Sequence, residues 1–405
     1  MQTRNFTVLA VITMLLYASL WTSAPYSSPD TLDYQATADD LRDGTLDVLP
    51  LRPIGYSVFL LFSGSGRWLY YTQMALYLLS IFLLVKLVCP QYQLVFILIA
   101  ILPPFFEPTA HILTETLTQF MLVVGVLSLY RWYQEKTVSV LLLGSVAICL
   151  SGLIRPTYQL LLPALALAVL WLTHQWKPVL LMLTVTVVMI GSYSLYNFRQ
   201  FHYFGTSPLL GMSLSTKTPR VLERLPDEYA VERDLLLRYR DASLLAPDNP
   251  NMPGTVHTGK WYIWDALPEY QAVTGQSTAE ASAHLLKLNL YLIQQEPLEY
   301  FVEVGEAAAL FWMPVSNFAN FDSRIFYLLW AIAHFAFIGS FFVVLHRRPA
   351  TDFLSRIMLV TIAYTWVISS TIAIGEPRYR QPVELFILLI LLNQISPKIE
   401  PKVVS

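Results

Sequence analysis

Ten apolar, nearly uncharged segments constrain the fold of this chain more than any other feature of its sequence. A bilayer core of about 30 Å requires roughly 20 apolar residues per helix, and most of these segments approach that length. Charged residues make up 13% of the 405 residues and hydrophobic residues 55%, whereas a soluble domain carries about 25% charged residues. We therefore predict an all-α polytopic membrane protein, a bundle of about ten transmembrane helices. The expected spans are 6–24, 68–88, 92–106, 110–130, 138–154, 157–173, 178–198, 325–345, 353–374 and 382–395.

The first segment also fits a cleaved signal peptide, because Arg4 precedes its apolar stretch and small residues follow it. Pro25 directly after Ala24 is unfavourable for cleavage, so we predict that the segment remains as a span. The net charge of −2 supplies no basic field for a nucleic-acid backbone, and this excludes nucleic acid as a partner.

Lysine and arginine in the connections predict the orientation. With the N-terminus in the cytoplasm, ten such residues lie inside and only Arg155, Arg378 and Arg380 lie in the short outside turns. The C-terminus is then also cytoplasmic, and the plasma membrane is the expected location. Three units follow: residues 1–198 with seven spans and a first outer loop at 25–67, a large outer loop at 199–324, and residues 325–405 with three spans.

Both outer segments carry helix signals. Ser28 is placed as an N-cap, with Pro29 at the first helical position and Asp30 in the first turn. Ser277 and Glu280 form a capping box, and Pro297 starts a further helix. We expect these mostly helical outer segments to lie along the membrane surface.

Charged side chains are almost absent from the span centres and gather at the outer boundary. Ion and proton transporters need ionisable groups near the midplane, so this distribution disfavours a transporter. A boundary set of carboxylates and guanidinium groups suits a substrate with an anionic head and an apolar tail, such as a lipid-linked phosphate. The set is Asp30, Asp33, Arg52, Glu107, His111, Glu115, Arg155, Glu376, Arg378 and Arg380.

Simpler roles exist for several of these residues. Asp30 also fits a residue that only complements the helix dipole, and Arg155 fits a side chain that snorkels to the headgroups. His111 and Glu115 are spaced for a shared metal ion, but two ligands are a weak pattern, so no metal or other cofactor is predicted; a divalent ion is allowed but not required.

Five motifs in order resemble the GT-C glycosyltransferases, in particular the branch of dolichyl-phosphate-mannose–protein mannosyltransferases and aminoarabinose transferases. Residues 30–44 (DTLDYQATADDLRDG) and 52–60 (RPIGYSVFL) are similar to the first outer loop of that group. Ile54 and Ser57 depart from it, because proline is usual at both positions. The other similar segments are 113–117 (LTETL), 153–156 (LIRP), 296–300 (EPLEY) ahead of Phe311-Trp312, and 376–382 (EPRYRQP).

The resemblance implies transfer of one sugar from a polyprenyl-phosphate donor to a glycan, lipid or protein acceptor on the extracytoplasmic face, with inversion. Asp30 is the expected base, Asp33 is the alternative base, and Tyr34 is expected to orient the base or the sugar. Arg378 is expected to bind the leaving phosphate, with Arg155 and Arg380 as helpers. The expected sugar-binding, acceptor-binding or supporting residues are Glu115, Glu376, Tyr379, Arg52, Tyr56 and His111.

Other classes of protein remain as alternatives. An O-antigen polymerase or ligase also has about ten spans and a large outer loop, but it relies on arginines and a histidine in that loop. A lipid-linked-saccharide flippase would place a charged cavity at the midplane. A scaffold or receptor would leave the boundary charges without a role.

Overall fold

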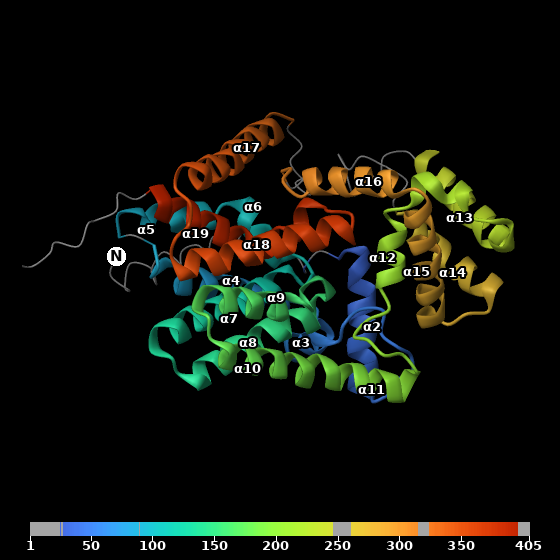
Figure 1. Cartoon of the computed structure of the whole chain (residues 1–405), viewed down its shortest axis with the longest axis horizontal. Coiled ribbons are helices and arrows are strands. Elements are labelled where there is room, and N and C mark those ends of the chain that lie inside the picture. Colours follow the sequence, from blue (N-terminus) through green and yellow to red (C-terminus); the bar gives the residue numbers. More distant parts are fainter. Residues whose placement is uncertain (1–24, 26, 89, 246–260, 315–323, 396–405) are drawn as a thin grey trace, which may run out of the picture.

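The computed structural model describes residues 25, 27–88, 90–245, 261–314 and 324–395. Within these ranges the regular structure is entirely helical. The first expected span, 6–24, lies outside the described residues. Figure 1 shows a bundle of helices with a smaller helical lobe at one end, and α2 lies between the two.

The bundle contains the helices that come before residue 202 and after residue 323. Short α-helical and 3-10 turns connect them, and a π-helical turn at Val187–Gly191 joins α10 to α11. The bundle helices are α2 (Pro29–Asp43), α3 (Gly55–Ser63), α4 (Arg67–Val85), α5 (Gln93–Ala100), α6 (Pro103–Phe106), α7 (Glu115–Glu135), α8 (Val138–Ile154), α9 (Leu161–Thr173), α10 (Trp176–Thr186), α11 (Ser192–Phe201), α17 (Arg324–Arg347), α18 (Phe353–Thr371) and α19 (Glu384–Ile395).

The lobe, which corresponds to the expected large outer loop, has a small apolar core of its own around Tyr262, Leu285 and Leu288. The capping box at Ser277 and Glu280 is confirmed. The lobe helices are α12 (Leu210–Ser215), α13 (Ala230–Leu245), α14 (Tyr262–Thr274), α15 (Thr278–Gln295) and α16 (Pro297–Leu310).

Helix α16 runs beside α18 rather than across its end. The Tyr300 hydroxyl donates to the carbonyl of Thr371 at 3.2 Å, and the indole N–H of Trp366 donates to the carbonyl of Ala308 at 3.0 Å. Helix α16 therefore packs along the last turns of α18.

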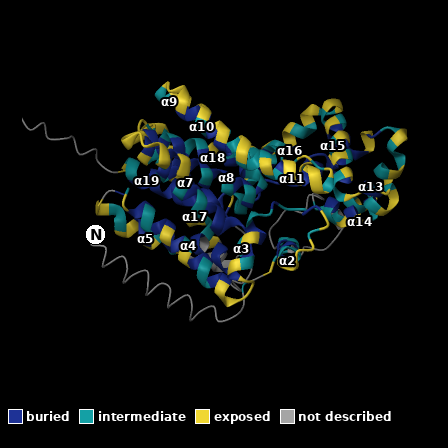
Figure 2. Cartoon of the chain, turned by 90° about the horizontal axis from the view of Figure 1, so that it is seen from below, coloured by how far each residue is buried: buried dark blue, intermediate teal, exposed yellow. Residues whose placement is uncertain are grey.

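The structure supports a helical membrane protein but does not confirm ten spans. Five helices among the described residues are long and apolar enough to cross a membrane: Arg67–Val85, Pro156–Thr173, Trp176–Phe201, Leu328–Arg347 and Phe353–Thr371. Large apolar side chains such as Leu167, Trp171 and Leu180 are exposed, and Figure 2 shows the exposed residues along α9 and α10. Exposed apolar surface of this extent suits contact with lipid.

The remaining expected spans are shorter or begin elsewhere. The segment 92–106 is interrupted after α5, because prolines at 103 and 104 disfavour helix at the residues before them. Helix α7 starts at Glu115, since residues 107–110 form a 3-10 turn. Helix α8 has the expected bounds at 138–154 but only 17 residues. Helix α19 has 12 residues and is buried by protein.

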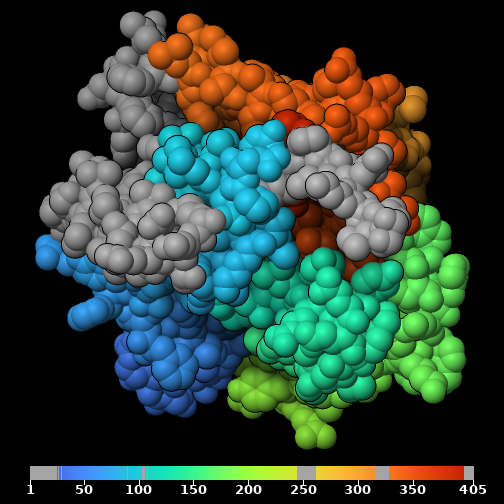
Figure 3. Space-filling model, turned by 90° about the vertical axis from the view of Figure 1, so that its left-hand side faces the viewer, coloured from blue at the N-terminus to red at the C-terminus, as the bar shows by residue number. Residues whose placement is uncertain are grey.

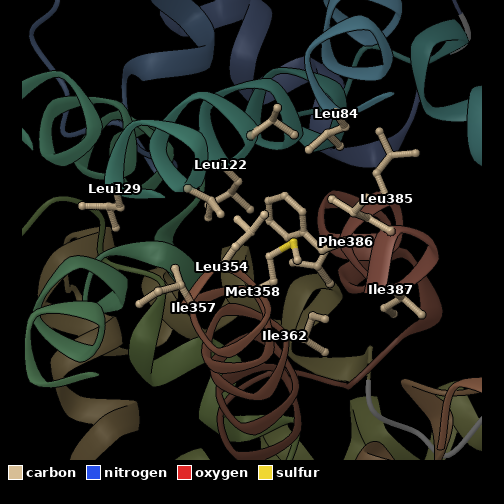
Figure 4. Close-up of a cluster of buried hydrophobic side chains, with 14 of the residues drawn as sticks. Leu84, Leu122, Leu129, Leu354, Ile357, Met358, Ile362, Leu385, Phe386 and Ile387 are labelled. Carbon is tan, nitrogen blue, oxygen red and sulfur yellow. The ribbon is translucent and has the colours of Figure 1, made fainter. Parts of the chain in front are cut away.

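The main core lies where α4, α7, α18 and α19 meet. Figure 4 shows Leu122 and Leu84 facing Met358 and Phe386 there. Helices α7 and α8 approach closely because Gly125 and Gly144 face each other; a Cβ at Gly144 would lie 3.1 Å from the carbonyl oxygen of Gly125. Small residues at such contacts are typical of membrane helices, whose association depends on tight packing.

The end of the bundle away from the lobe carries the connections expected to be cytoplasmic. Figure 3 looks at this end and shows the α7–α8 connection and α17. Arg131 and Lys136 lie at the end of α7, and Arg347 and Arg348 lie at the end of α17. The basic connections and the lobe therefore lie at opposite ends, while the orientation in a membrane stays a prediction.

Gly55 holds α3 against the end of α8, and its replacement by alanine is expected to destabilise the protein by about 1–3 kcal/mol, the usual cost of overpacking. A Cβ there would lie 2.6 Å from the backbone oxygen of Leu153, and backbone cannot yield as a side chain can. The thermal unfolding midpoint in detergent measures the effect. Gly305→Ala is the matched control, because its Cβ meets nothing within 4 Å; equal midpoints for both variants would contradict the prediction.

Candidate active site

Five segments that are far apart in the sequence meet at the end of the bundle nearest the lobe. They are the first turn of α2, the segment before α3, the turn before α7, the residue after α8 and the turn between α18 and α19. Each position has a local cause. Ser28 is the N-cap that starts α2, with proline following it, as predicted. Pro156 ends α8 at Ile154, and Gly375 turns the chain after α18 with a φ of +76°.

Asp30 lies between two guanidinium groups. Its Oδ1 accepts a hydrogen bond from Nη2 of Arg52 at 2.7 Å, and its Oδ2 accepts one from Nη1 of Arg378 at 3.3 Å. Arg378 is 348 residues further along the chain. The fold therefore brings the expected base and the expected phosphate-binding arginine into direct contact.

Arg52 joins both expected carboxylates of α2. Its Nε donates to Oδ2 of Asp33 at 3.0 Å, while its Nη2 contacts Asp30. Its guanidinium also lies over the ring of Tyr34, 5.4 Å from the centroid. A planar fork with five donors makes such shared contacts possible. Arg52 thus fixes the first turn of α2 from one side.

Arg378 and Arg155 both lie close to the ring of Tyr379. The Arg378 guanidinium carbon is 5.7 Å and that of Arg155 is 4.6 Å from the centroid of this ring. Nε of Arg378 forms an ion pair with Oε2 of Glu376 at 2.9 Å, and Nη1 of Arg155 forms one with Oε1 of Glu115 at 2.7 Å. Arg155 is buried, so it does not snorkel to the surface.

Burial and the arginines act in opposite directions on these carboxyl groups. Burial raises the pKa of Asp30, but the positive charges of Arg378, Arg52 and Arg155 outweigh it and leave the pKa below its usual value. Burial raises the pKa of Glu376 above its usual value despite the nearby Arg378. Burial also raises the pKa of the Tyr34 hydroxyl to about 12. Asp30 is therefore ionised at neutral pH, and Tyr34 keeps its proton.

Each of the three guanidinium groups in this described cluster has at least one carboxylate partner. Arg52 pairs with Asp30 and Asp33, Arg378 pairs with Asp30 and Glu376, and Arg155 pairs with Glu115. An anion that binds Arg378 shares its positive charge with Asp30 and Glu376. A further negative charge this close to Asp30 raises the pKa of its carboxyl group and makes the carboxylate more basic.

Arg380 does not join this cluster, which corrects its expected role as a helper in phosphate binding. Its guanidinium is fully buried and pairs with Glu384 at 3.0 Å, and it donates to the carbonyls of Phe311 and Met313. Because Glu384 belongs to α19 and Phe311 and Met313 follow α16, this side chain connects the end of the lobe to the start of α19.

The structure places the other expected residues as follows. Tyr56 is buried edge-on against Tyr34, with ring centroids 4.9 Å apart. The backbone carbonyl of His111 accepts a hydrogen bond from Gln73. The side chain of Glu107 is outside the described residues. Among the residues that the structure describes, no group of three or more His, Cys, Asp or Glu side chains is arranged to hold a metal ion.

Gln73 is the residue that the sequence reasoning missed. It lies in an apolar span, its side chain is fully buried, and it contacts both Tyr56 and the turn before α7. The available signal was a lone amide inside an otherwise apolar helix, since polar groups at such positions find partners within the bundle.

The fold and the site together define a helical membrane protein with a buried carboxylate–guanidinium cluster at one end of its bundle. No protein-family model matches this chain, and no curated protein or solved structure shows a significant similarity to it.

Proposed function

We propose that the protein is a glycosyltransferase that moves one sugar from a polyprenyl-phosphate donor to an acceptor at the extracytoplasmic face of the plasma membrane. The observation that carries the proposal is the contact between Asp30 and Arg378 at the end of an apolar bundle. A carboxylate beside a guanidinium supplies the two groups that such a transfer needs, a base and a partner for the leaving phosphate.

In the proposed reaction Asp30 takes the proton of the acceptor hydroxyl while the oxygen of that hydroxyl forms a bond to the anomeric carbon. The bond between this carbon and the phosphate oxygen breaks, and the polyprenyl phosphate leaves with the bonding electrons. Arg378 contacts the phosphate, and the buried charge of Arg155 adds to the same field. An inverting displacement requires the base and the phosphate on opposite sides of the sugar, so the Asp30–Arg378 contact must open to admit the donor.

The phosphate head and the isoprenoid tail have separate places in this proposal. The head lies at the guanidinium cluster, and the tail extends along the lipid-facing surface of the bundle. The leaving polyprenyl phosphate is a monoester and carries less negative charge than a leaving pyrophosphate. We therefore propose that the arginines suffice without a metal ion. We assign acceptor binding to the lobe, because long connecting segments set specificity on a fixed scaffold.

The test is release of free polyprenyl phosphate from a panel of donors. Purified protein in lipid nanodiscs is incubated with isoprenoid-phosphate sugars that differ in the sugar, together with a membrane extract that supplies lipid, glycan and protein acceptors, and the lipid product is separated by chromatography. At least one donor is expected to yield free carrier, and the matching pyrophosphate-linked sugar is expected to react poorly. Folded protein that releases carrier from no member of the panel would contradict the proposal.

A further inference from the structure

Gln73 uses almost all its hydrogen-bonding capacity inside the bundle. Its Oε1 accepts from the Tyr56 hydroxyl at 3.0 Å, and its Nε2 donates to the carbonyl oxygens of Thr109 at 3.0 Å and His111 at 2.8 Å. A side-chain amide has two donors and one oxygen acceptor. One side chain of α4 therefore ties α3 to the turn that precedes α7.

The first of these ties leads to Asp30 through aromatic rings. Tyr56 meets the ring of Tyr34 at an interplanar angle of 71°, and the face of Tyr34 carries the guanidinium of Arg52. Arg52 in turn contacts Asp30. Because Tyr56 and Tyr34 are both buried, a change in the tilt of Tyr56 is transmitted to Arg52.

The second tie leads to Asp30 through the backbone. His111 is followed by Ile112, whose carbonyl oxygen accepts from the hydroxyl of Thr31 at 3.2 Å. Thr31 is the residue after Asp30 and closes the capping interaction with Ser28. The same turn continues to Glu115, which holds Arg155.

We infer that Gln73 is a positioning residue, which sets the places of Asp30, Arg52 and Arg155 without touching the substrate. The inference rests on the proposed function for its kinetic consequence. The physical basis is the convergence of two independent chains of contacts, one through Tyr56 and one through Ile112, on the first turn of α2. Within an apolar span, no water replaces the amide if it is removed, so both chains loosen together.

The experiment replaces Gln73 by Met, which keeps the volume and removes all three hydrogen bonds. A displacement of about 1 Å at the reacting groups costs about 100-fold in rate, so kcat of Gln73→Met is expected to fall about 100-fold. The donor KM is expected to stay within about threefold, because Glu376 also holds Arg378 and the three hydrogen bonds of Gln73 go to other residues.

Tyr77→Phe is the matched control. Tyr77 lies one turn further along α4, is equally buried, and donates to the carbonyl of Ala100 at 2.7 Å, away from the site. Its variant is expected to lose thermal stability but to keep kcat within about twofold. The double variant Tyr56→Phe/Gln73→Met is expected to lose no more than Gln73→Met alone, since the Tyr56 hydroxyl acts through its hydrogen bond to Gln73, which Gln73→Met already removes.

Carbodiimide labelling of Asp30, read by mass spectrometry, tests the geometry without any transfer assay. Labelling is expected to rise in Gln73→Met and to stay at the wild-type level in Tyr77→Phe. Unchanged labelling of Asp30 in Gln73→Met would overturn the inference whether or not the protein transfers sugar. A wild type that transfers no sugar, with labelling raised as expected, would contradict only the proposed function. An active wild type whose Gln73→Met variant keeps its kcat would contradict only this inference.

Discussion

Replacement of Asp30 by Asn is expected to abolish sugar transfer while leaving expression and donor binding near the wild-type level. An amide cannot accept the proton of the acceptor hydroxyl, and loss of a general base costs about 100-fold to 10,000-fold in rate. Arg378 loses one anionic partner in this variant, so the donor phosphate is expected to bind no more weakly than before. The measurement is kcat and donor KM in the carrier-release assay.

Two other aspartates of α2 serve as comparisons. Asp39 is exposed and pairs only with Arg42, so Asp39→Asn is expected to keep full activity. Asp33 shares Arg52 with Asp30, so Asp33→Asn tests the alternative base; it is expected to reduce activity moderately through the position of Arg52. Retained turnover in Asp30→Asn, with loss in Asp33→Asn, would assign the base to Asp33.

The sequence was sufficient to predict the start of α2 and the end of α8, because local signals determine those positions. The Ser28 cap and the proline after it place Asp30 in the first turn of α2, and Pro156 ends α8 directly before Arg155. These are short-range effects of backbone geometry and side-chain capping. They do not depend on the packing of the rest of the chain.

The number of spans was not predictable in the same way. Hydropathy reports that a segment avoids water and does not distinguish lipid from protein surroundings. Helix α19 is as apolar as a span, yet its residues from Leu385 to Ile390 are buried by other helices. Segment 92–106 has the composition of a span but breaks at its prolines.

Arg378 and Arg380 have different partners because of three-dimensional packing. Both lie in one seven-residue motif, and the sequence suggested the same kind of role for both. A 3-10 helix turns the chain by about 120° per residue, so side chains two residues apart near Pro377–Tyr379 point in different directions. Arg378 turns to Asp30, whereas Arg380 turns to Glu384 and the lobe. Gln73 was missed for the same reason, because its partners belong to distant segments.

Replacement of Arg378 is expected to separate the two roles of this guanidinium. Arg378→Ala removes the proposed phosphate contact, so the donor KM is expected to rise at least about tenfold, in line with the loss of a charge-assisted hydrogen bond worth about 1.5–3 kcal/mol. Arg378→Lys is expected to recover the donor KM only partly, because an ammonium group cannot form the two parallel contacts of a guanidinium. Arg131→Ala is the control, since Arg131 is exposed and pairs with Glu135.

The pH dependence of kcat/KM distinguishes charge from geometry at this position. Burial raises the pKa of Asp30, and Arg378 is the largest single influence that lowers it. Activity requires the ionised carboxylate and is lost as the pH falls through this pKa, so removal of the charge in Arg378→Ala is expected to move the acid limb to higher pH. Arg378→Lys keeps the charge, and its acid limb is expected to stay near that of the wild type although its donor KM is raised. An acid limb that does not move in Arg378→Ala would show that Asp30 is not the group that titrates, and full activity of Arg378→Lys would exclude a two-pronged contact with phosphate.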